Sequence, residues 1–472
     1  MRQFGRLKSR TFLAVGVAAA LVAAVGGAGM ATSRAAGALA NAHPASTSTL
    51  TIWYSTDDPV ETNWAPGLVS IFEKTHPKIK VEMKVYDLDD FNDKMQDALG
   101  SNTGPDLAYA TPREPAIPIY IVHHELLNLT SYASKNRWAS LLRPGLLDFW
   151  NAPFKVWSKK ATNLSGDAVR ATSATQIYGV PDAMAADGVA YNTDLMNKLG
   201  ISFPKTLADL ESDAAKAKAA GMIPFGIGNN DLWLGDDWYI MLANEDFSVS
   251  QLQKVLSDGS FNFNQSAFVK AGNLMSSWSK DGYLTPNFQS LDAQGGMDSF
   301  FRGNTLFQLM SSSEDAQLLE DEQETKMPIT VAAFPASFTG YTGLVPYSGY
   351  EGWIVPKATH NKSAAIKWIN FMLSDAATQY TMKNGVLPTT NVPAADAPTQ
   401  FQKEFLNAFA GARRGIYLDA APVPNFTANM EGNIDALLAG KESGAAVAKD
   451  LEKAYKSYGR DSNKTPDIDG EY

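Results

Sequence analysis

The hydrophobic pattern changes its period several times between residues 50 and 109. Residues 50–54 (LTIWY) are a short apolar run typical of a buried strand, and residues 66–75 carry apolar side chains at helical spacing. Apolar and polar residues then alternate over 79–86, which predicts a strand with one buried face. A second helical stripe covers 89–99, and residues 104–109 return to a strand. This alternation of strand and helix predicts the start of an open α/β sheet.

The same patterns recur later in the chain and predict a second α/β unit. Short strands are indicated at 177–181, 188–192 and 222–227, with a helix over 206–219. Residues 305–310 (TLFQLM) predict a further strand. No internal repeat and no long low-complexity linker follow the N-terminal segment. We therefore expect two α/β units within one chain.

Polar loops follow several of these strands at their carboxyl ends, where open α/β sheets bind ligands. They cover residues 55–58, 110–114 and 229–239, and the last of them (NNDLWLGDDWY) contains three aspartates, two asparagines and two tryptophans. A tryptophan ring can cover the apolar face of a sugar, and aspartate and asparagine can hydrogen-bond to its hydroxyl groups. This composition favours a binding site for a hydroxyl-rich ligand.

A structural interpretation of the same residues stays open. Trp233 and Trp238 could be core residues, with the neighbouring acids in a solvated turn, although those acids make full burial of the stretch costly. The loops 55–58 and 110–114 could likewise be ordinary solvated loops.

The N-terminus has the pattern of an export signal. Four basic residues within the first ten precede an uncharged run over 12–25, and Ala38-Leu39-Ala40 offers a cleavage site. Residues 1–40 are therefore predicted to be a signal peptide, with cleavage near 40 or, alternatively, near 31. Because the uncharged stretch continues to Ala31, an uncleaved membrane anchor is the alternative.

Charge and cysteine content exclude several partners and chemistries. The formal net charge is −10, and removing the five basic residues of 1–40 changes it to −15, because no acidic residue precedes Asn41. Such a surface repels nucleic acid and anionic lipid, so we expect neither as a partner. The absence of cysteine excludes disulfides, thiolate metal sites, a cysteine nucleophile and attachment through a lipidated cysteine.

Common catalytic and metal motifs are also missing from the sequence. The five histidines have no metal-binding spacing, and no G-x-S-x-G motif occurs. The acids of 231–237 do not match a calcium loop, although a structural calcium stays open. We therefore predict no catalytic residue, no metal and no cofactor. A hydrolase would need two facing carboxylates, and the polar clusters are instead divided between two α/β units.

Six stretches, taken in order, resemble the extracellular solute-binding proteins of bacterial ABC importers. The resemblance is to the sugar-binding branch that includes maltose-binding protein, and it covers about residues 50–458. The stretches are LTIWYSTDD (50–58), IFEKTHPKIKVEMK (71–84), KMQDALGSNTGPDLAYA (94–110), IYGVPDAMAADGVAYNTDLMNKLGISFPKTLADL (177–210), FFRGNTLFQLMSS (300–312) and GYEGWIVPKATHNKSAAIKWINFMLSDAATQY (349–380).

The resemblance implies a two-lobed α/β fold, the periplasmic-binding-protein fold, with hinge strands and a ligand cleft between the lobes. Lobe one would comprise 49–183 plus 345–396, and lobe two 184–344 plus 397–460, followed by a tail at 461–472.

The resemblance also implies which residues contact the ligand. They lie in the loops after the first and third strands, in the 229–239 stretch, after the 305–310 strand and near the hinge. The residues are Ser55, Asp57, Asp58, Arg113, Glu114, Asn230, Trp233, Asp237, Trp238, Ser312, Glu314, Tyr350, Glu351 and Trp353, with the segment Met184 to Asp187 and Phe426 as weaker candidates. Many family members have a tryptophan where this chain has Ser311-Ser312-Ser313, so stacking must come from elsewhere.

The function implied by the resemblance is that of a monomeric, extracytoplasmic receptor. It would bind a mono- or oligosaccharide by lobe closure and deliver it to the membrane permease of an ABC importer. Two alternative functions are a secreted carbohydrate-active hydrolase and a polyamine-binding receptor. A third, an anchored sensor ectodomain, would keep its N-terminus.

Overall fold

The computed structural model describes most of the chain after residue 46. Its described residues are 47–55, 59–86, 88–110, 117, 120–121, 123–147, 150, 176–244, 246–257, 261–312, 330–334, 344–411, 413–419, 421 and 426–460. The predicted signal peptide (1–40) and tail (461–472) lie outside these residues.

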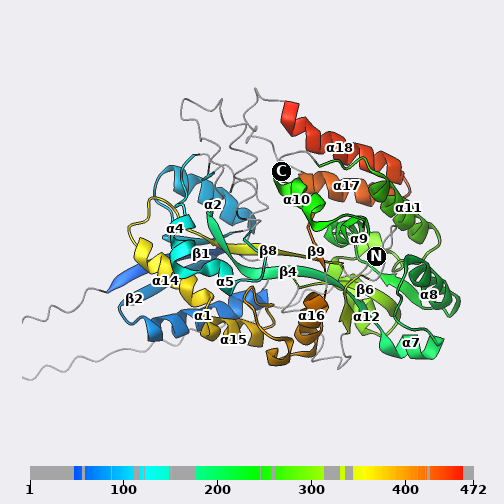
Figure 1. Ribbon diagram of the computed structural model, residues 1–472, viewed down its shortest axis with the longest axis horizontal. Helices are drawn as coiled ribbons and strands as arrows, with labels where there is room; N and C mark the ends of the chain where they lie inside the picture. The colour runs from blue at the N-terminus through cyan, green and yellow to red at the C-terminus, as the bar shows by residue number, and fades with distance from the viewer. Residues whose placement is uncertain are drawn as a thin grey trace, which may run out of the picture. The chain divides into compact units, whose positions relative to one another are not determined.

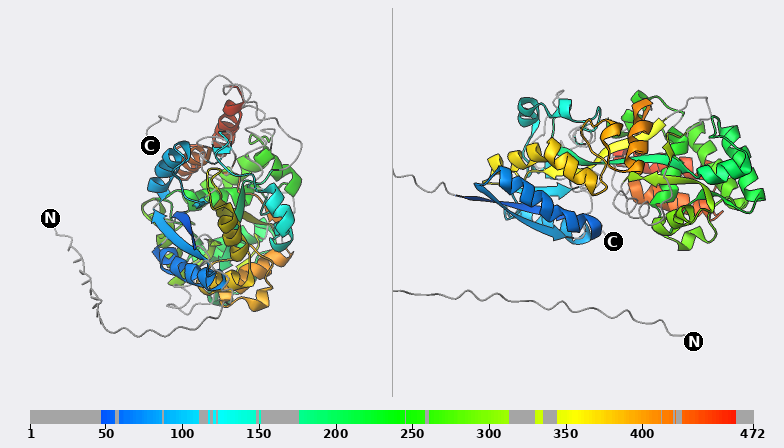
Figure 2. Two further views of the ribbon diagram at one scale, coloured as in Figure 1. Left: turned by 90° about the vertical axis from the view of Figure 1, so that its left-hand side faces the viewer. Right: turned by 90° about the horizontal axis from the view of Figure 1, so that it is seen from below.

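Three parallel strands form one end of the sheet, in the order β2-β1-β3. The strand β1 is apolar at alternate positions, so Leu50, Ile52 and Tyr54 are all buried. Helices α1 and α14 lie against this group (Figure 2). The elements of this part are β1 (Ser48–Ser55), α1 (Pro59–Thr75), β2 (Ile79–Tyr86), α2 (Leu88–Gly100), β3 (Leu107–Ala110), α4 (Thr130–Asn136), α5 (Trp138–Leu141), α14 (Lys362–Met372), α15 (Asp375–Lys383) and a 3-10 turn, η4 (Ala394–Asp396).

Two long antiparallel strands continue the sheet from β3. They are β8 (Leu344–Ile354), which pairs with β3, and β4 (Gly179–Tyr191), which pairs with β8 along its first half. Figure 1 shows these two strands running side by side. The second half of β4 pairs with β6, so the full order is β2-β1-β3-β8-β4-β6-β5.

Helices surround the strands at the β6 end of the sheet, and α11, α17 and α18 pack on one another. The elements here are α7 (Thr193–Leu199), α8 (Leu207–Ala219), β5 (Ile223–Gly226), α9 (Trp233–Asn244), α10 (Val249–Ser257), α11 (Ser266–Lys280), η2 (Phe288–Ser290), α12 (Ala293–Phe301), β6 (Thr305–Ser311), β7 (Val331–Ala332), α16 (Gln400–Gly411), β9 (Arg413–Gly415), α17 (Phe426–Leu438) and α18 (Gly444–Arg460).

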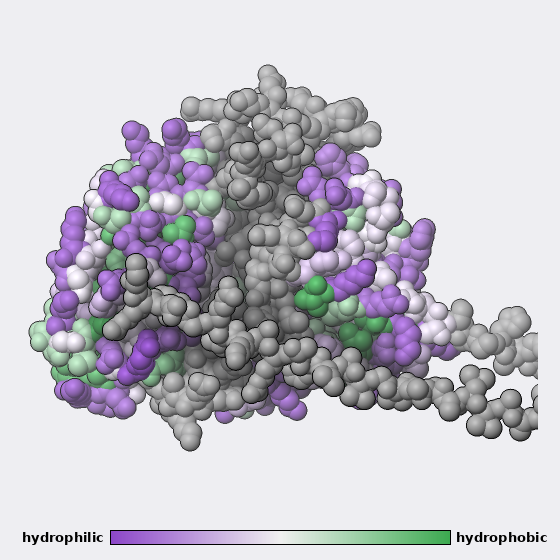
Figure 3. Space-filling model, turned by 180° about the vertical axis from the view of Figure 1, so that it is seen from behind, coloured by the Kyte–Doolittle hydropathy of each residue, from purple (hydrophilic) through white to green (hydrophobic). Residues whose placement is uncertain are grey.

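Two hydrophobic cores stabilise the described chain. One gathers residues from β1, β3, β8 and α14, and includes Trp353 and Trp368. The other gathers β5, β6, α9, α11 and α17, and includes Trp238 and Trp278. Hydrophilic side chains predominate on the described surface of the face drawn in Figure 3. The second core also includes Phe91 and Met95 of α2 and Ala108 of β3, so it is not confined to the β6 end of the sheet.

The predicted strands and helices are found, with two differences. Residues 177–181 and 188–192 were expected to be separate strands, but they belong to the single strand β4, because pairing with β8 and then β6 carries the backbone through Asp182. Helix α1 begins at Pro59 and continues through Pro66, which removes one helical hydrogen bond. Burial of Leu68 and Phe72 in the core offsets that loss.

Candidate ligand-binding site

Strand β4 changes its pairing partner at one position. Ala186 is the last residue of β4 in register with β8, opposite Tyr347, and Asp187 is the first in register with β6, opposite Ser311. Ligands of open α/β sheets bind where the strand order changes direction, because neighbouring loops diverge there. Asp187, which the family resemblance indicated as a ligand contact, lies at this change of partner, so its surroundings are the candidate binding site.

The Asp187 side chain is fully buried at this position. Its Oδ1 accepts a hydrogen bond of 2.8 Å from the hydroxyl of Tyr417, which follows β9. A buried carboxylate is costly unless it is hydrogen-bonded, so Tyr417 both stabilises and orients it. Asp187 was a sequence candidate, whereas Tyr417 was missed, because the stretch Ile416-Tyr417-Leu418 carries no recognisable motif.

Ser312 joins the end of β6 to β4 beside the same position. Its hydroxyl donates to the Met184 carbonyl at 2.8 Å and accepts from the Ala186 N–H at 2.9 Å. The side chain is buried, and both hydrogen bonds are made to backbone. Ser312 therefore fixes the backbone of β4 beside Asp187.

Replacing Ser312 with alanine should reduce the free energy of unfolding by about 1–3 kcal/mol, because two buried backbone groups lose this partner. Urea denaturation measures the difference. A matched control is Ser277→Ala, since the Ser277 hydroxyl donates only to Leu274 of its own helix. We expect the control to change stability by less than about 0.5 kcal/mol. Equal losses in the two variants would contradict the role given to Ser312.

A second carboxylate is held on β8. Glu351 is half-buried, and its Oε2 accepts a hydrogen bond of 2.9 Å from the Tyr109 hydroxyl. The Tyr109 ring stacks on Tyr54, with centroids 4.4 Å apart. Both tyrosines lie one residue before the end of their strands, so Glu351 is fixed near the carboxyl ends of β1 and β3. The loops that follow these ends, 55–58 and 110–114, were predicted as candidate binding loops from their position alone.

A tryptophan that the sequence analysis did not single out covers the β4–β8 pair. Trp150 is buried, and its Nε1 donates to the Gly349 carbonyl at 3.1 Å. A Cβ placed on Gly179 or Gly352 would lie 2.1 Å or 2.8 Å from its ring. Glycine at these two positions lets the indole lie directly on the paired backbones, which fixes the strands that present Asp187 and Glu351.

The polar residues that open the NNDLWLGDDWY stretch are used to anchor it. Asn229 accepts from the Gly235 N–H at 3.0 Å and donates to Asp435. Asp231 accepts from the Ala293 N–H and from the Trp233 indole, each at 3.1 Å. These bonds attach the start of α9 to α12 and α17, so the structural interpretation accounts for part of this composition.

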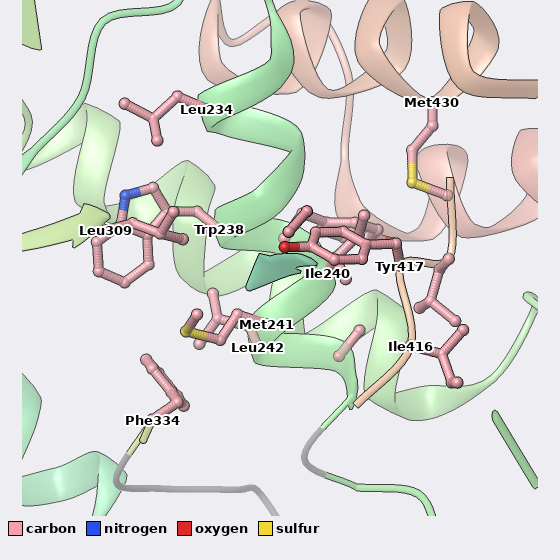
Figure 4. Close-up of a cluster of buried hydrophobic side chains, with 14 of the residues drawn as sticks. Leu234, Trp238, Ile240, Met241, Leu242, Leu309, Phe334, Ile416, Tyr417 and Met430 are labelled. Carbon is pink, nitrogen blue, oxygen red and sulfur yellow. The ribbon is translucent and has the colours of Figure 1, made fainter. Parts of the chain in front are cut away.

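The two tryptophans of the stretch differ in environment. Trp238 is 1% exposed and packs on Phe225, Trp278 and Phe334, as Figure 4 shows in part. Trp233 is half-buried against the edge of the same core. The structure therefore favours a core role for Trp238, while Trp233 keeps surface that a ligand can contact.

The remaining sequence candidates are either buried, exposed or outside the description. Trp353 is a core residue that packs on Tyr109 and Trp368. Asn230 is exposed, and Asp237 is buried in α9. The rest are Asp57, Asp58, Arg113, Glu114 and Glu314, which lie outside the described residues, and Ser55 and Tyr350, whose backbones belong to β1 and β8 and whose side chains lie outside the description. The structure thus brings together Asp187 and Ser312, whereas Glu351 lies on β8 opposite Ala183, four residues along β4 from Asp187.

The described residues contain neither a metal-ion site nor a membrane-spanning helix. Among the described residues, no group of three or more histidine, aspartate or glutamate side chains is arranged to hold a metal ion. No helix in the described part of the chain has both the length and the apolar character needed to span a bilayer.

Comparison with known proteins identifies a family. A family model described as bacterial extracellular solute-binding protein matches residues 53–379. The maltodextrin-binding protein MdxE of Bacillus subtilis is 23% identical over 296 residues, which cover 60% of this chain and 66% of that protein. A binding protein of Brucella abortus is 29% identical over 219 residues, 46% of this chain, so the match spans about half (52%) of that relative.

Solved structures show the same fold at lower sequence identity. The GacH receptor of Streptomyces glaucescens, solved without ligand and with acarbose, has a TM-score of 0.67 at 19% identity, covering 88% of this chain and 99% of its own. A sugar transporter protein of Bacillus licheniformis in complex with stachyose has a TM-score of 0.64 at 18% identity, covering 87% and 100%. The predicted fold class, the α/β periplasmic-binding-protein fold, is confirmed by these likenesses.

Proposed function

Because the chain belongs to the bacterial extracellular solute-binding proteins, we propose that it is the carbohydrate-binding component of an ABC importer. The family implies an extracytoplasmic location. The observation that carries the proposal is the buried Asp187 carboxylate, oriented by Tyr417 where β4 changes from β8 to β6.

The chemistry of the candidate site suits a neutral, hydroxyl-rich ligand. Two carboxylates are held by tyrosine hydroxyls, Asp187 by Tyr417 and Glu351 by Tyr109. Carboxylates accept hydrogen bonds from several donors at once, and bonds to charged groups are about twice as strong as neutral ones. A sugar supplies many hydroxyl donors, and the half-buried Trp233 offers a ring to an apolar sugar face. The sugar ligands named for MdxE, GacH and the Bacillus licheniformis protein support this choice.

The proposed mechanism is closure of two lobes about β4 and β8. Lobe one comprises 49–183 plus 345–396, and lobe two 184–344 plus 397–460. The register of the β4–β8 pair shifts between Pro181 and Ala183 and again between Ala183 and Ala185, at the proposed boundary. Interrupted ladder bonds let strands bend with little loss of hydrogen bonding. A ligand that contacts both lobes must favour the closed form by about 5 kcal/mol to convert a mostly open population.

The closed, ligand-bound monomer would then dock on the membrane permease and release the sugar unchanged. This distinguishes the proposal from a hydrolase, whose sugar would be cleaved. The matching family model, the maltodextrin-binding protein MdxE and the GacH receptor are described as binding proteins or receptors, which supports a receptor without catalysis.

A panel of mono- and oligosaccharides tests the proposal through thermal unfolding and isothermal titration calorimetry. A true ligand at about 100 times its Kd stabilises the protein by about 2.7 kcal/mol, which raises the unfolding temperature. Small-angle scattering with and without that sugar should show a more compact particle when it is bound. Chromatography of the recovered sugar is the control, because a receptor returns it intact. Release of reducing ends, or binding without any compaction, would reject the receptor mechanism.

A further inference from the structure

A cavity of about 500 Å³ lies away from the candidate site, at the opposite end of the parallel strands. It is bounded by the end of α2, the residues before β3, the segment 123–125 and the segment 356–360 after β8. Of the proposed ligand contacts, Glu351 is held instead near the carboxyl ends of β1 and β3. Strand β3 separates the two ends by four residues, or about 13 Å. A volume of this size is typical of small-molecule sites.

Histidine is concentrated in this cavity. His123, His124 and His360 all line it, which is three of the five histidines in 472 residues. Lys357 lines it as well, and all four side chains are exposed to solvent. The chain as a whole has a formal net charge of −10. This cavity differs from it, because four of its lining side chains carry or can gain a positive charge.

The two segments that carry these groups are held together by backbone. The Lys357 N–H donates to the Glu125 carbonyl at 2.7 Å, and the Leu127 N–H donates to the Val355 carbonyl at 2.8 Å. His124 adopts a left-handed conformation with φ of 58°, which turns the chain at this point. The two segments that carry the histidines are therefore joined by backbone hydrogen bonds and do not form independent loops.

The charges that face the cavity change with pH. Its titratable and charged lining groups are Asp106, His123, His124, Glu125, Lys357 and His360. The Asp106 carboxylate is already occupied, since it accepts from Thr51, Thr359 and Asn361. Burial raises the pKa of Glu125, against the opposing influence of His123. An imidazole that gains a proton becomes a cation, so protonation of these side chains would add positive charge to the cavity while Glu125 moves toward its neutral form.

We propose that this cavity is a second binding site, which takes a small anion carrying a carboxylate or phosphate group when the histidines are protonated. Cationic imidazoles and the Lys357 ammonium donate charge-assisted hydrogen bonds to such an anion. A metal ion is a poorer fit, because the described residues contain no group of three or more ligands placed to hold one. The cavity shares no lining residue with the proposed carbohydrate contacts.

Calorimetry of the full mature chain with inorganic phosphate, and separately with succinate, tests this site. Titrations are run at about pH 5.5 and about pH 7.5, on either side of the ordinary histidine pKa. We expect binding to be about tenfold tighter at the lower pH, because neutral hydrogen bonds become charge-assisted. Phosphate and succinate each gain a proton over the same interval, so the triple variant described below gives the part of the pH dependence that comes from the probes. A response to only one probe identifies the anionic group that is recognised, and a response to both shows that either group suffices.

Two variants distinguish the contribution of these histidines to anion binding from general effects of pH on the protein. The triple variant H123N/H124N/H360N should lose the pH-dependent part of binding, and asparagine accepts the left-handed backbone at position 124. His76→Asn is the matched control, because His76 stacks on Phe72 and lies outside the cavity. Circular dichroism checks that each variant is folded. Failure of both probes to bind, equal affinity at the two pH values, or unchanged binding by the triple variant would overturn the proposal.

Discussion

Replacing Trp238 with alanine is expected to lower the free energy of unfolding by about 3–5 kcal/mol. The ring is 1% exposed, and its centroid lies 5.7 Å from those of Phe225 and Trp278. Its Nε1 donates to the Gly226 carbonyl at 3.3 Å, so the variant also removes a buried hydrogen bond. Truncation leaves a cavity that the packed rings around it cannot fill. Guanidinium denaturation measures the loss.

Trp233→Ala is the matched control for that experiment. Its indole is half-buried and donates to Asp231 within the same loop, so we expect a loss of about 1 kcal/mol. Under the proposed function Trp233→Ala also weakens sugar binding, whereas folded Trp238→Ala protein keeps it. A Trp238 variant with unchanged stability and lost binding would show that this ring contacts ligand and would contradict its place in the core.

Replacing Asp187 with alanine is expected to weaken sugar binding about a hundredfold, because the site loses a buried, oriented carboxylate acceptor. The carboxylate is fully buried, accepts from Tyr417 at 2.8 Å, and occupies the position where β4 changes partner. Isothermal titration calorimetry with the best sugar of the panel measures the change. Urea denaturation run in parallel confirms that the variant is folded.

Tyr417→Phe separates orientation from direct contact at Asp187. Removing the hydroxyl keeps the ring and the carboxylate but releases the Oδ1 hydrogen bond. We expect about a tenfold loss of affinity, smaller than that of Asp187→Ala, because the acceptor remains but is less well held. Glu442→Ala serves as a control, since this acid lies in the connection between α17 and α18 and is not among the proposed ligand contacts. Full affinity in folded Asp187→Ala would remove this residue from the proposed site.

Much of the secondary structure could be predicted from local pattern. The apolar run of β1 and the alternation of β2 were visible because their side chains divide between a core and a solvent face. The Thr206 cap of α8 was also predictable, and its hydroxyl accepts from the Asp209 N–H at 3.1 Å. The continuity of β4 was missed, because Asp182 and Ala183 look like a break until the pairing with β8 is known.

The candidate site was less accessible to sequence reasoning. Resemblance indicated Asp187, Ser312 and Glu351, and the structure shows what holds each of them. Tyr417 lies 230 positions from Asp187, and Tyr109 lies 242 positions from Glu351. No local pattern reports such partners, since they meet only when the strands pair. For the same reason the tryptophans of 229–239 looked alike in the sequence but differ in burial.

The sequence by itself determined the order of α/β elements, the acidic and cysteine-free character of the chain, and its family. The element order and the composition depend on local periodicity and residue content, which neighbouring residues express without reference to distant ones, whereas the family rests on the resemblance of six ordered stretches. Tertiary structure alone decided that Trp238 is a core residue, that Asp187 lies where β4 changes partner, and that three histidines share a cavity. Burial and hydrogen-bond partners depend on strand pairing across hundreds of residues, so they arise only in the folded chain.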